Sequence, residues 1–188
     1  YRPTPWLRAQ KLIAAGEGLM FGLSRTPRRE RELLFSLPIW SNTTWAVVRD
    51  GEQDSIQRFS DLDGETVCWA RGSSYGEAFT GAGLGHMVPH EASDDDGALR
   101  MGAAGRCRAA LITLDMEHLN QLERYPTLAH LTERDLAIVP VMMAPTSLHF
   151  ATGHGSRWAW AIERINKVVS RSRGELERLK LSGAASAG

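Results

Sequence analysis

The chain has 188 residues, of which 43% are hydrophobic and 23% are charged, and these proportions are ordinary for a globular protein with its own core. Its 22 Lys and Arg residues balance its 22 Asp and Glu residues, so no net charge favours nucleic acid or a membrane surface. The longest apolar stretches, such as 136–145, are too short to span a bilayer, and the first residues lack the layout of a secretory signal.

The first quarter of the chain predicts two helices and two strands. In chain order they are a helix at 6–15, a strand at 19–23, a helix at 26–35 and a strand at 43–49. Thr26 and Pro27 mark the start of the second helix, because Thr is a good N-cap and Pro suits the first helical position. Leu33, Leu34 and Phe35 are expected to finish that helix before Pro38 stops it.

The rest of the chain alternates between strands and helices. Strands are predicted at 66–70, 85–90, 108–114, 138–143 and 148–151, and helices from 75, at 98–103, at 128–134 and from 156. Gly174 is expected to break the last helix, and the acidic segment 93–97 predicts a turn. Strands that alternate with helices indicate an α/β protein with largely parallel sheets.

The redox state of the two cysteines, Cys68 and Cys107, is open from the sequence. Cys68 lies in an apolar strand and Cys107 in a polar turn, so the two could pair or could remain free. We expect buried thiols rather than a disulfide, because free cysteines are often buried like small hydrophobic residues.

Two predicted helix starts could hold an anion. Each follows a strand and is rich in hydroxyl groups, the first at 24–26 (Ser-Arg-Thr) and the second at 72–74 (Gly-Ser-Ser). A helix N-terminus offers unpaired backbone N–H groups and the positive end of a dipole. Arg29 could reach back over the first start and hold a carboxylate through two parallel hydrogen bonds. The alternative is that Ser24 and Ser74 only cap helices and that the arginines are solvated.

Five segments share their order and spacing with a known family. They are 5–40, with Trp-x-Arg, Ser-x-Thr-x-x-Arg and Phe-Ser-x-Pro; 61–77, with Asp-Leu-x-Gly-x-x-Val and Gly-Ser-Ser; 105–112, in place of Gly-Arg-x-Asp-Ala; 142–155; and 165–179. Taken together, they resemble the bacterial extracellular solute-binding proteins of family 3, the periplasmic amino-acid-binding type.

The resemblance implies a two-lobed type 2 periplasmic-binding-protein-like fold of the α/β class, with a mainly parallel sheet in each lobe and closure about a hinge. Residues 1–48 and 143–188 would form the first lobe and residues 49–142 the second. The family begins with a strand, a helix and a second strand before the Trp-x-Arg helix, and this chain starts after them. We therefore expect the first lobe to be incomplete, and a partial or trimmed chain is the explanation we favour over a partner's strands or a degenerate homologue.

The resemblance also implies a ligand site. In the family, an Arg at the position of Arg29 binds the α-carboxylate of the ligand, helped by hydroxyl and amide groups at the positions of Ser24 and Ser74. The neighbouring Ser73 and Gly22 complete the ligand-binding residues expected on this basis.

Several positions depart from the family pattern. Members that bind α-amino acids place an Asp where this chain has Thr113, and the Asp of the Gly-Arg-x-Asp-Ala motif is replaced by Arg108. Asp115 lies two residues after Thr113 on the same side of the strand and could hold an ammonium group instead. Phe21 stands where a small acceptor is common. The ligand could therefore be an amino acid or an organic acid without the amine.

The function implied by the resemblance is capture of a small carboxylate-bearing solute in the periplasm or outside the cell, for an ABC-transporter permease or a membrane receptor. We expect no cofactor, no catalytic residue, no nucleic-acid partner and no membrane span, and no Cys or His pattern has the spacing of a zinc site. One alternative is a cyclohexadienyl dehydratase-like enzyme on the same scaffold, with Asp115, Glu117 or His118 as acid or base. Another is a sensory or degenerate module without transport.

Overall fold

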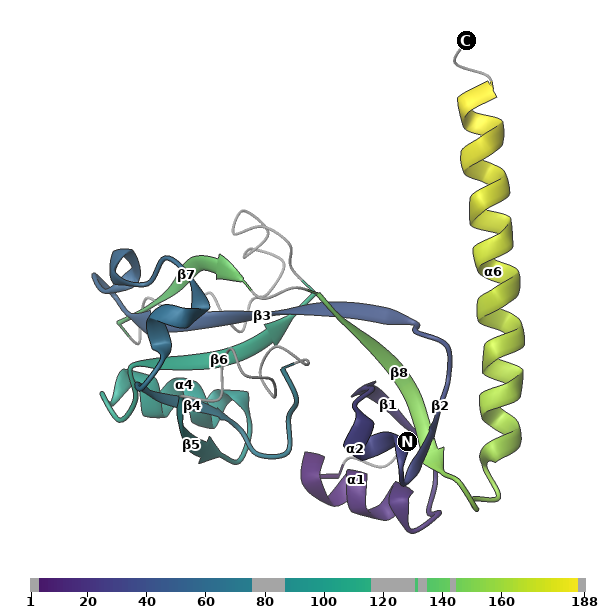
Figure 1. Ribbon diagram of the computed structural model, residues 1–188, viewed down its shortest axis with the longest axis horizontal. Helices are drawn as coiled ribbons and strands as arrows, with labels where there is room; N and C mark the ends of the chain where they lie inside the picture. Colours follow the sequence, from purple (N-terminus) through teal and green to yellow (C-terminus); the bar gives the residue numbers. More distant parts are fainter. Residues whose placement is uncertain (1–3, 76–86, 116–130, 132–134, 143–144, 186–188) are drawn as a thin grey trace. The chain divides into compact units, whose positions relative to one another are not determined.

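The computed structural model describes residues 4–75, 87–115, 131, 135–142 and 145–185 (Figure 1). The chain divides into two compact units: unit 1 consists of Tyr1–Leu7 and Ser41–Thr146, and unit 2 of Arg8–Trp40 and Ser147–Gly188. Each unit is therefore assembled from segments that are far apart in the sequence. Within the described residues, no helix combines the length and the hydrophobicity that crossing a bilayer requires.

Unit 2 is built around strand β8 (Thr146–Gly153), which lies between two shorter strands. β1 (Met20–Ser24) and β2 (Leu33–Phe35) both pair with β8 in the antiparallel direction (Figure 1). The helices are α1 (Trp6–Ala14), whose first residues are counted with unit 1, α2 (Pro27–Glu30) and α6 (Ala159–Ala185). Ile13, Leu23, Leu33 and Ile162 are its most deeply buried large apolar side chains.

Helix α1 ends where the glycine pattern predicts. Gly16 has a φ of +85°, and its N–H donates to Ile13 O while the N–H of Glu17 donates to Leu12 O. These two bonds form a Schellman motif, which needs a left-handed residue after the helix and therefore favours glycine. The motif turns the chain from α1 into β1.

Unit 1 contains five strands in the order β7–β3–β6–β4–β5. Their bounds are β3 Trp40–Arg49, β4 Thr66–Ala70, β5 Val88–Ala92, β6 Ala109–Leu114 and β7 Leu136–Met142. Helix α4 (Asp95–Ala103) and the 3₁₀ turns η1 (Gln53–Ser55) and η2 (Phe59–Leu62) accompany them. β4 is parallel to both β5 and β6, whereas β3 is antiparallel to β6 and β7.

Alternate side chains of β3 enter two separate hydrophobic cores of unit 1. Trp45 and Val47 join the core that includes Leu99 of α4, whereas Ala46 and Val48 join the other. Because successive side chains of a strand point to opposite faces, one continuous apolar run can fill both cores. The sheet of unit 1 is therefore covered on both sides.

The structure has the α/β class that the sequence predicts, with two units that are each assembled from separate segments of the chain. The expectation of a mainly parallel sheet in each lobe is wrong in detail. In the described part of unit 2 both strand pairs are antiparallel, and in unit 1 parallel and antiparallel pairs occur together. The long strand β3 runs antiparallel to β6 and β7, and β8 runs antiparallel to β1 and β2, because strand direction depends on connections that local patterns do not reveal.

Two predicted helix boundaries are corrected. Residues 33–35 do not finish a helix but form β2, because their backbone pairs with Ala151, Thr152 and Gly153 of β8. Gly174 does not break the last helix, and α6 continues to Ala185. A glycine inside a helix costs only about 1 kcal/mol relative to alanine, so strong helix formers on both sides can carry the helix through it.

The other predicted elements are confirmed within one to three residues at their ends, except where they fall outside the described residues. The helix expected from 75 onward and most of the helix expected at 128–134 lie outside them. The turn predicted at 93–97 is only partly correct, because helix α4 already begins at Asp95.

The expectation of two free thiols is wrong, because Cys68 and Cys107 form a disulfide. Cys68 lies in β4, and Cys107 comes two residues before β6, the strand that pairs with β4. Their Cα atoms are 5.8 Å apart, which is ordinary for a bonded pair. Strand pairing that spans 39 residues of sequence brings them together, and local sequence cannot show this.

We expect removal of the disulfide to destabilise unit 1. The double variant Cys68→Ala, Cys107→Ala should lower the free energy of unfolding by about 4 kcal/mol, because the bond closes a loop of 39 residues in the unfolded chain. Urea denaturation of the oxidised protein and of the variant measures the difference. The variant should not respond to dithiothreitol, and an equal unfolding midpoint for the two proteins would contradict the prediction.

Candidate functional site

Arg29 folds back onto the end of strand β1. Its Nη1 donates to the carbonyl oxygen of Ser24 at 2.9 Å and to the hydroxyl Oγ of Ser24 at 2.7 Å. Helix α2 makes this possible over only six residues: Thr26 is the N-cap, with its hydroxyl accepting from Arg29 N at 3.3 Å, and Pro27 is the first helical residue. The structure therefore brings together Arg29 and Ser24, two of the predicted site residues, within unit 2.

The charge of Arg29 is held in an unfavourable environment. Burial, and then repulsion from Arg28, lowers the pKa of Arg29 to about 10. The guanidinium still carries its charge at neutral pH, at a cost of about 3 kcal/mol that is present at every pH below about 10 and relieved only above it. A carboxylate bound to Arg29 would offset this cost through charge-assisted hydrogen bonds.

The other arginines of this segment behave as surface charges. Arg25, Arg28 and Arg31 are exposed, and Arg25 forms an ion pair with Glu30. Gly22, which the sequence also places in the site, has a φ of +87° and interrupts the pairing of β1 with β8 as a bulge two residues before Ser24.

The remaining predicted site residues gather along one edge of the sheet of unit 1. β4 is parallel to both β5 and β6, so the carboxyl ends of the three strands lie at the same edge. Ser73 and Ser74 follow β4, while Thr113 and Asp115 lie at the end of β6. In open α/β sheets the carboxyl ends of parallel strands are the usual place for a ligand.

Ser74 has the only side chain of this edge whose hydroxyl is both buried and without a hydrogen-bond partner among the described residues. Its neighbours are engaged: the side chain of Ser73 bonds to the hydroxyl of Tyr75, and the indole Nε1 of Trp6 donates to Gly72 O at 3.2 Å. A buried hydroxyl without a partner is costly, and a ligand atom would relieve that cost.

Asp95 is a member of this edge that the sequence did not single out. It follows β5 as the first residue of α4, and burial, followed by repulsion from Asp94, raises the pKa of Asp95 to about 6. Its charge also acts on Tyr75, whose pKa is raised mainly by burial and next by Asp95. The run of three aspartates was the available signal, but a sequence does not show which of three neighbouring carboxylates is buried.

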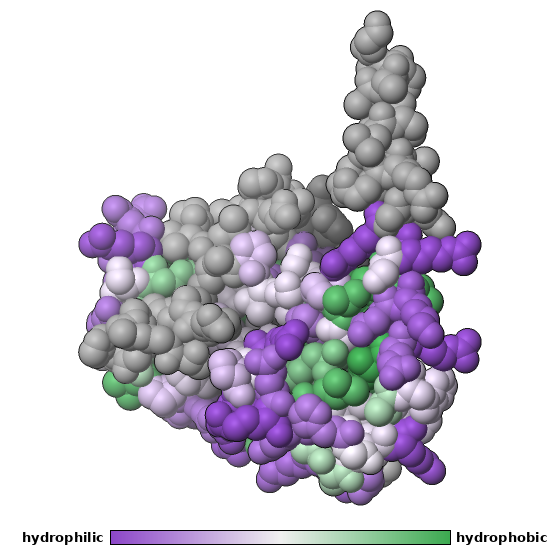
Figure 2. All heavy atoms as spheres, turned by 45° about the vertical axis from the view of Figure 1, so that its right-hand side comes forward, coloured by the Kyte–Doolittle hydropathy of each residue, from purple (hydrophilic) through white to green (hydrophobic). Residues whose placement is uncertain are grey.

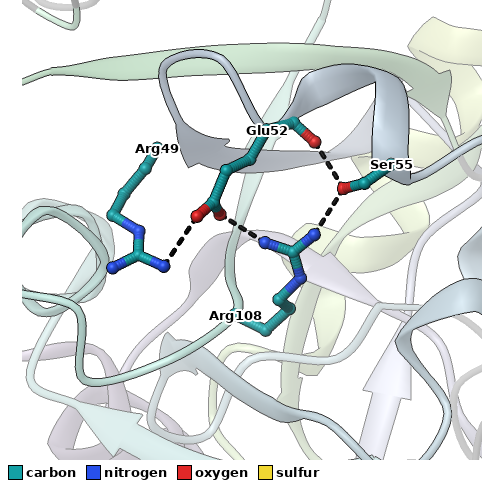
Figure 3. A network of polar contacts seen from close by, with 4 residues as sticks. All are labelled: Arg49, Glu52, Ser55 and Arg108. Carbon is teal, nitrogen blue, oxygen red and sulfur yellow. Dashed lines mark hydrogen bonds and ion pairs between the residues drawn. The ribbon is translucent and has the colours of Figure 1, made fainter.

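Arg108, which replaces the Asp of the family motif, has a structural role (Figure 3). Its guanidinium bonds to the carboxylate of Glu52 and to the hydroxyl of Ser55, and Glu52 also pairs with Arg49 at 2.7 Å. These contacts fasten the start of β6 to the turn that follows β3. The positive charge of Arg108 is thus already matched by a carboxylate of the same unit.

Comparison with known proteins identifies the fold. No protein-family model and no curated protein matches the sequence. Among solved structures, holo ArgBP from T. maritima matches with a TM-score of 0.69 and 17% identity, over 92% of this chain and 71% of that chain. An ancestral arginine-binding protein bound to glutamine matches with a TM-score of 0.71 and 19% identity, over 92% of this chain and 73% of that chain.

A third match comes from a receptor. The GluR0 ligand-binding core in complex with L-glutamate has a TM-score of 0.68 and 16% identity, over 94% of this chain and 77% of that chain. The chain has the fold of the amino-acid-binding solute-binding proteins. At these identities the likeness establishes the solute-binding fold and leaves the ligand to be argued from this chain's own residues.

We expect Asp95→Asn to stabilise the protein at neutral pH. The folded-state pKa of about 6 lies above the ordinary value of 3.8, so the stabilising contribution of protonated Asp95 is complete below pH 3.8 and is lost as the pH rises through 6. The variant should gain about 1–2 kcal/mol at pH 7.5, once the loss of a favourable charge at the start of α4 is subtracted, and nothing at pH 3.5. Chemical denaturation at the two pH values tests this, with Asp96→Asn at the exposed neighbouring position as the control. A gain that is the same at both pH values would refute it.

Proposed function

We propose that this protein is a solute-binding protein that captures a small carboxylate-bearing ligand, either an amino acid or an organic acid. Arg29 and Ser24 of unit 2 bind the carboxylate, and Ser74 of unit 1 contributes its hydroxyl, with Ser73 beside it as a further residue of the proposed site. Gly22, Thr113 and Asp115 are the further residues proposed to line the site. Closure of two lobes about a hinge is the mode of capture that the family resemblance implies.

The observation that carries the proposal is the half-buried guanidinium of Arg29 beside Ser24. Folded proteins seldom bury an arginine at such a cost unless an anion or a hydrogen-bond network compensates it. The planar guanidinium suits a carboxylate in particular, because two of its N–H groups can bond to the two oxygens in parallel. The hydroxyl of Ser74, which has no hydrogen-bond partner among the described residues, supports the inclusion of Ser74 among the proposed binding residues.

The chemistry of the site favours binding over catalysis. Among the described residues, no three His, Cys, Asp or Glu side chains come together as they would to hold a metal ion. Most of the groups that we assign to the ligand, the guanidinium of Arg29 and the hydroxyls of Ser24 and Ser74, hold an acid through hydrogen bonds, and Asp115 is proposed to hold an ammonium group. The solved structures that share the fold and are described above are named as binding proteins or as a ligand-binding core.

We place the protein in the periplasm or outside the cell, with an ABC-transporter permease or a membrane receptor as its partner. The disulfide between Cys68 and Cys107 supports this location, because disulfides form and persist in oxidising compartments. One of the solved structures with this fold is named as the substrate-binding protein of an amino acid ABC transporter.

We expect Arg29→Gln to abolish carboxylate binding without unfolding the protein. At a ligand concentration 100 times the Kd, a bound carboxylate stabilises the wild type by about 2.7 kcal/mol, and the variant should lose the corresponding rise in Tm. The ligand-free variant should unfold within about 1 kcal/mol of the wild type, because the lost bonds to Ser24 are offset by removal of a buried charge. A thermal-shift screen with amino acids and small organic acids measures both quantities.

Arg31→Gln is the matched control, since Arg31 ends the same short helix and its side chain is exposed. This control should keep the full ligand-induced shift. If the shift survives in Arg29→Gln, the carboxylate binds elsewhere and the proposed site is wrong.

A further inference from the structure

An aromatic pair lies on the open face of the sheet of unit 2, next to the carboxylate-binding residues. The rings of Phe21 in β1 and Phe150 in β8 are 4.9 Å apart between centroids and tilted by 44°. Phe21 is 47% exposed, which is unusual for a phenylalanine held in a paired strand. Hydrophobic atoms bordered by hydrophilic side chains are visible on the surface of the molecule (Figure 2).

The bulge at Gly22 places Phe21 and Ser24 on the same face. Three positions apart on a regular strand, the two side chains would point to opposite faces. Gly22 is left out of the register, so that Phe21 lies opposite Phe150 and Ser24 lies opposite Leu148. Since Leu148 and Phe150 are two residues apart in β8, Phe21 and Ser24 share a face and are separated by about 7 Å.

The burial of the neighbouring residues agrees with this assignment. Leu23 and His149, which are paired with each other, are buried on the opposite face of the sheet. On the face of Phe21, Leu148 and Phe150 are half-buried, whereas Ser24 is itself buried, with the guanidinium of Arg29 bonded to its hydroxyl. This face therefore carries the guanidinium of Arg29 beside Ser24, and the aromatic ring of Phe21 lies about 7 Å from Ser24.

We propose that the Phe21–Phe150 pair binds the side group of the ligand and selects carboxylic acids that carry an apolar or aromatic group. The inference rests on the function proposed above and adds the class of solute. With its carboxylate on Arg29 and Ser24, a ligand of this class lays its ring against Phe21, where tilted or offset aromatic contacts and burial of apolar surface both stabilise the complex.

The same geometry disfavours other carboxylates. Acids with only a methyl group are too short to reach Phe21 from Ser24, so they gain nothing from the pair. Dicarboxylates would set a second charge against two aromatic rings, which supply no hydrogen-bond donor, and that charge would lose its water without compensation.

Isothermal titration calorimetry with two matched pairs of acids tests the proposal. The pairs are 3-phenylpropionate with propionate, and L-phenylalanine with L-alanine, so each pair differs by one phenyl group. We expect the phenyl-bearing acid of at least one pair to bind about tenfold or more tightly than its partner, which is the amount expected for one ring placed on an aromatic surface.

Phe21→Ser should reduce this discrimination to less than threefold and leave the affinity for the smaller acid unchanged. Leu37→Ser is the matched control, because Leu37 is also a partly exposed apolar residue of unit 2, 36% exposed, and should keep the discrimination. The Tm of both ligand-free variants checks that they fold, and Phe21→Leu, which keeps an apolar side chain, should retain part of the discrimination.

The possible failures are distinguishable. If the smaller acid binds as tightly as its phenyl-bearing partner, or if L-arginine or succinate binds more tightly than both, the aromatic pair does not select the ligand, although Arg29 can still hold its carboxylate. If Phe21→Ser keeps the discrimination, the ring is bound elsewhere. If no carboxylate binds to the wild type, the proposed function fails and this inference fails with it.

Discussion

A partly buried positive charge determines how the residues proposed to bind the ligand are arranged in unit 2. Arg29 stands on a helix of only four residues, and its guanidinium turns back to the carbonyl and hydroxyl oxygens of Ser24. These bonds hold the guanidinium in place. They do not fully replace the water that it loses on burial, and the pKa of Arg29 is lowered mainly for that reason. The strand before it is bent by the bulge at Gly22, so the aromatic surface of Phe21 and the charge come to lie on one face.

Unit 1 carries a different kind of surface. Three parallel strand ends carry hydroxyl groups and carboxylates; the hydroxyl of Ser74 is buried and has no partner among the described residues, and Asp95 is partly buried at the start of a helix. Arg108 stands where the family motif has an Asp. Its guanidinium bonds to Glu52 and Ser55. A substitution at a motif position can therefore stabilise the fold without indicating a different ligand.

Sequence patterns predicted most elements of the fold and the return of the Arg29 side chain to the end of the strand before it. The glycine after α1, the Thr26-Pro27 helix start and the strand at 66–70 follow from the preferences of a few neighbouring residues. The same patterns failed at residues 33–35, where three apolar residues suit a helix end or a strand equally well and only pairing with β8 decides. Strand direction failed for the same reason, since it depends on partners far away in the sequence.

The sequence by itself determined the contact between Ser24 and Arg29, because six residues with a Thr cap and a Pro leave the arginine one short path back to the strand end. Tertiary structure alone decided the disulfide, the burial of Asp95 and the meeting of Phe21 with Phe150. Each of these needs two segments that are distant in the chain to lie side by side. These segments are held together by core packing and strand pairing across the whole chain. The helix and strand propensities of neighbouring residues do not predict such contacts.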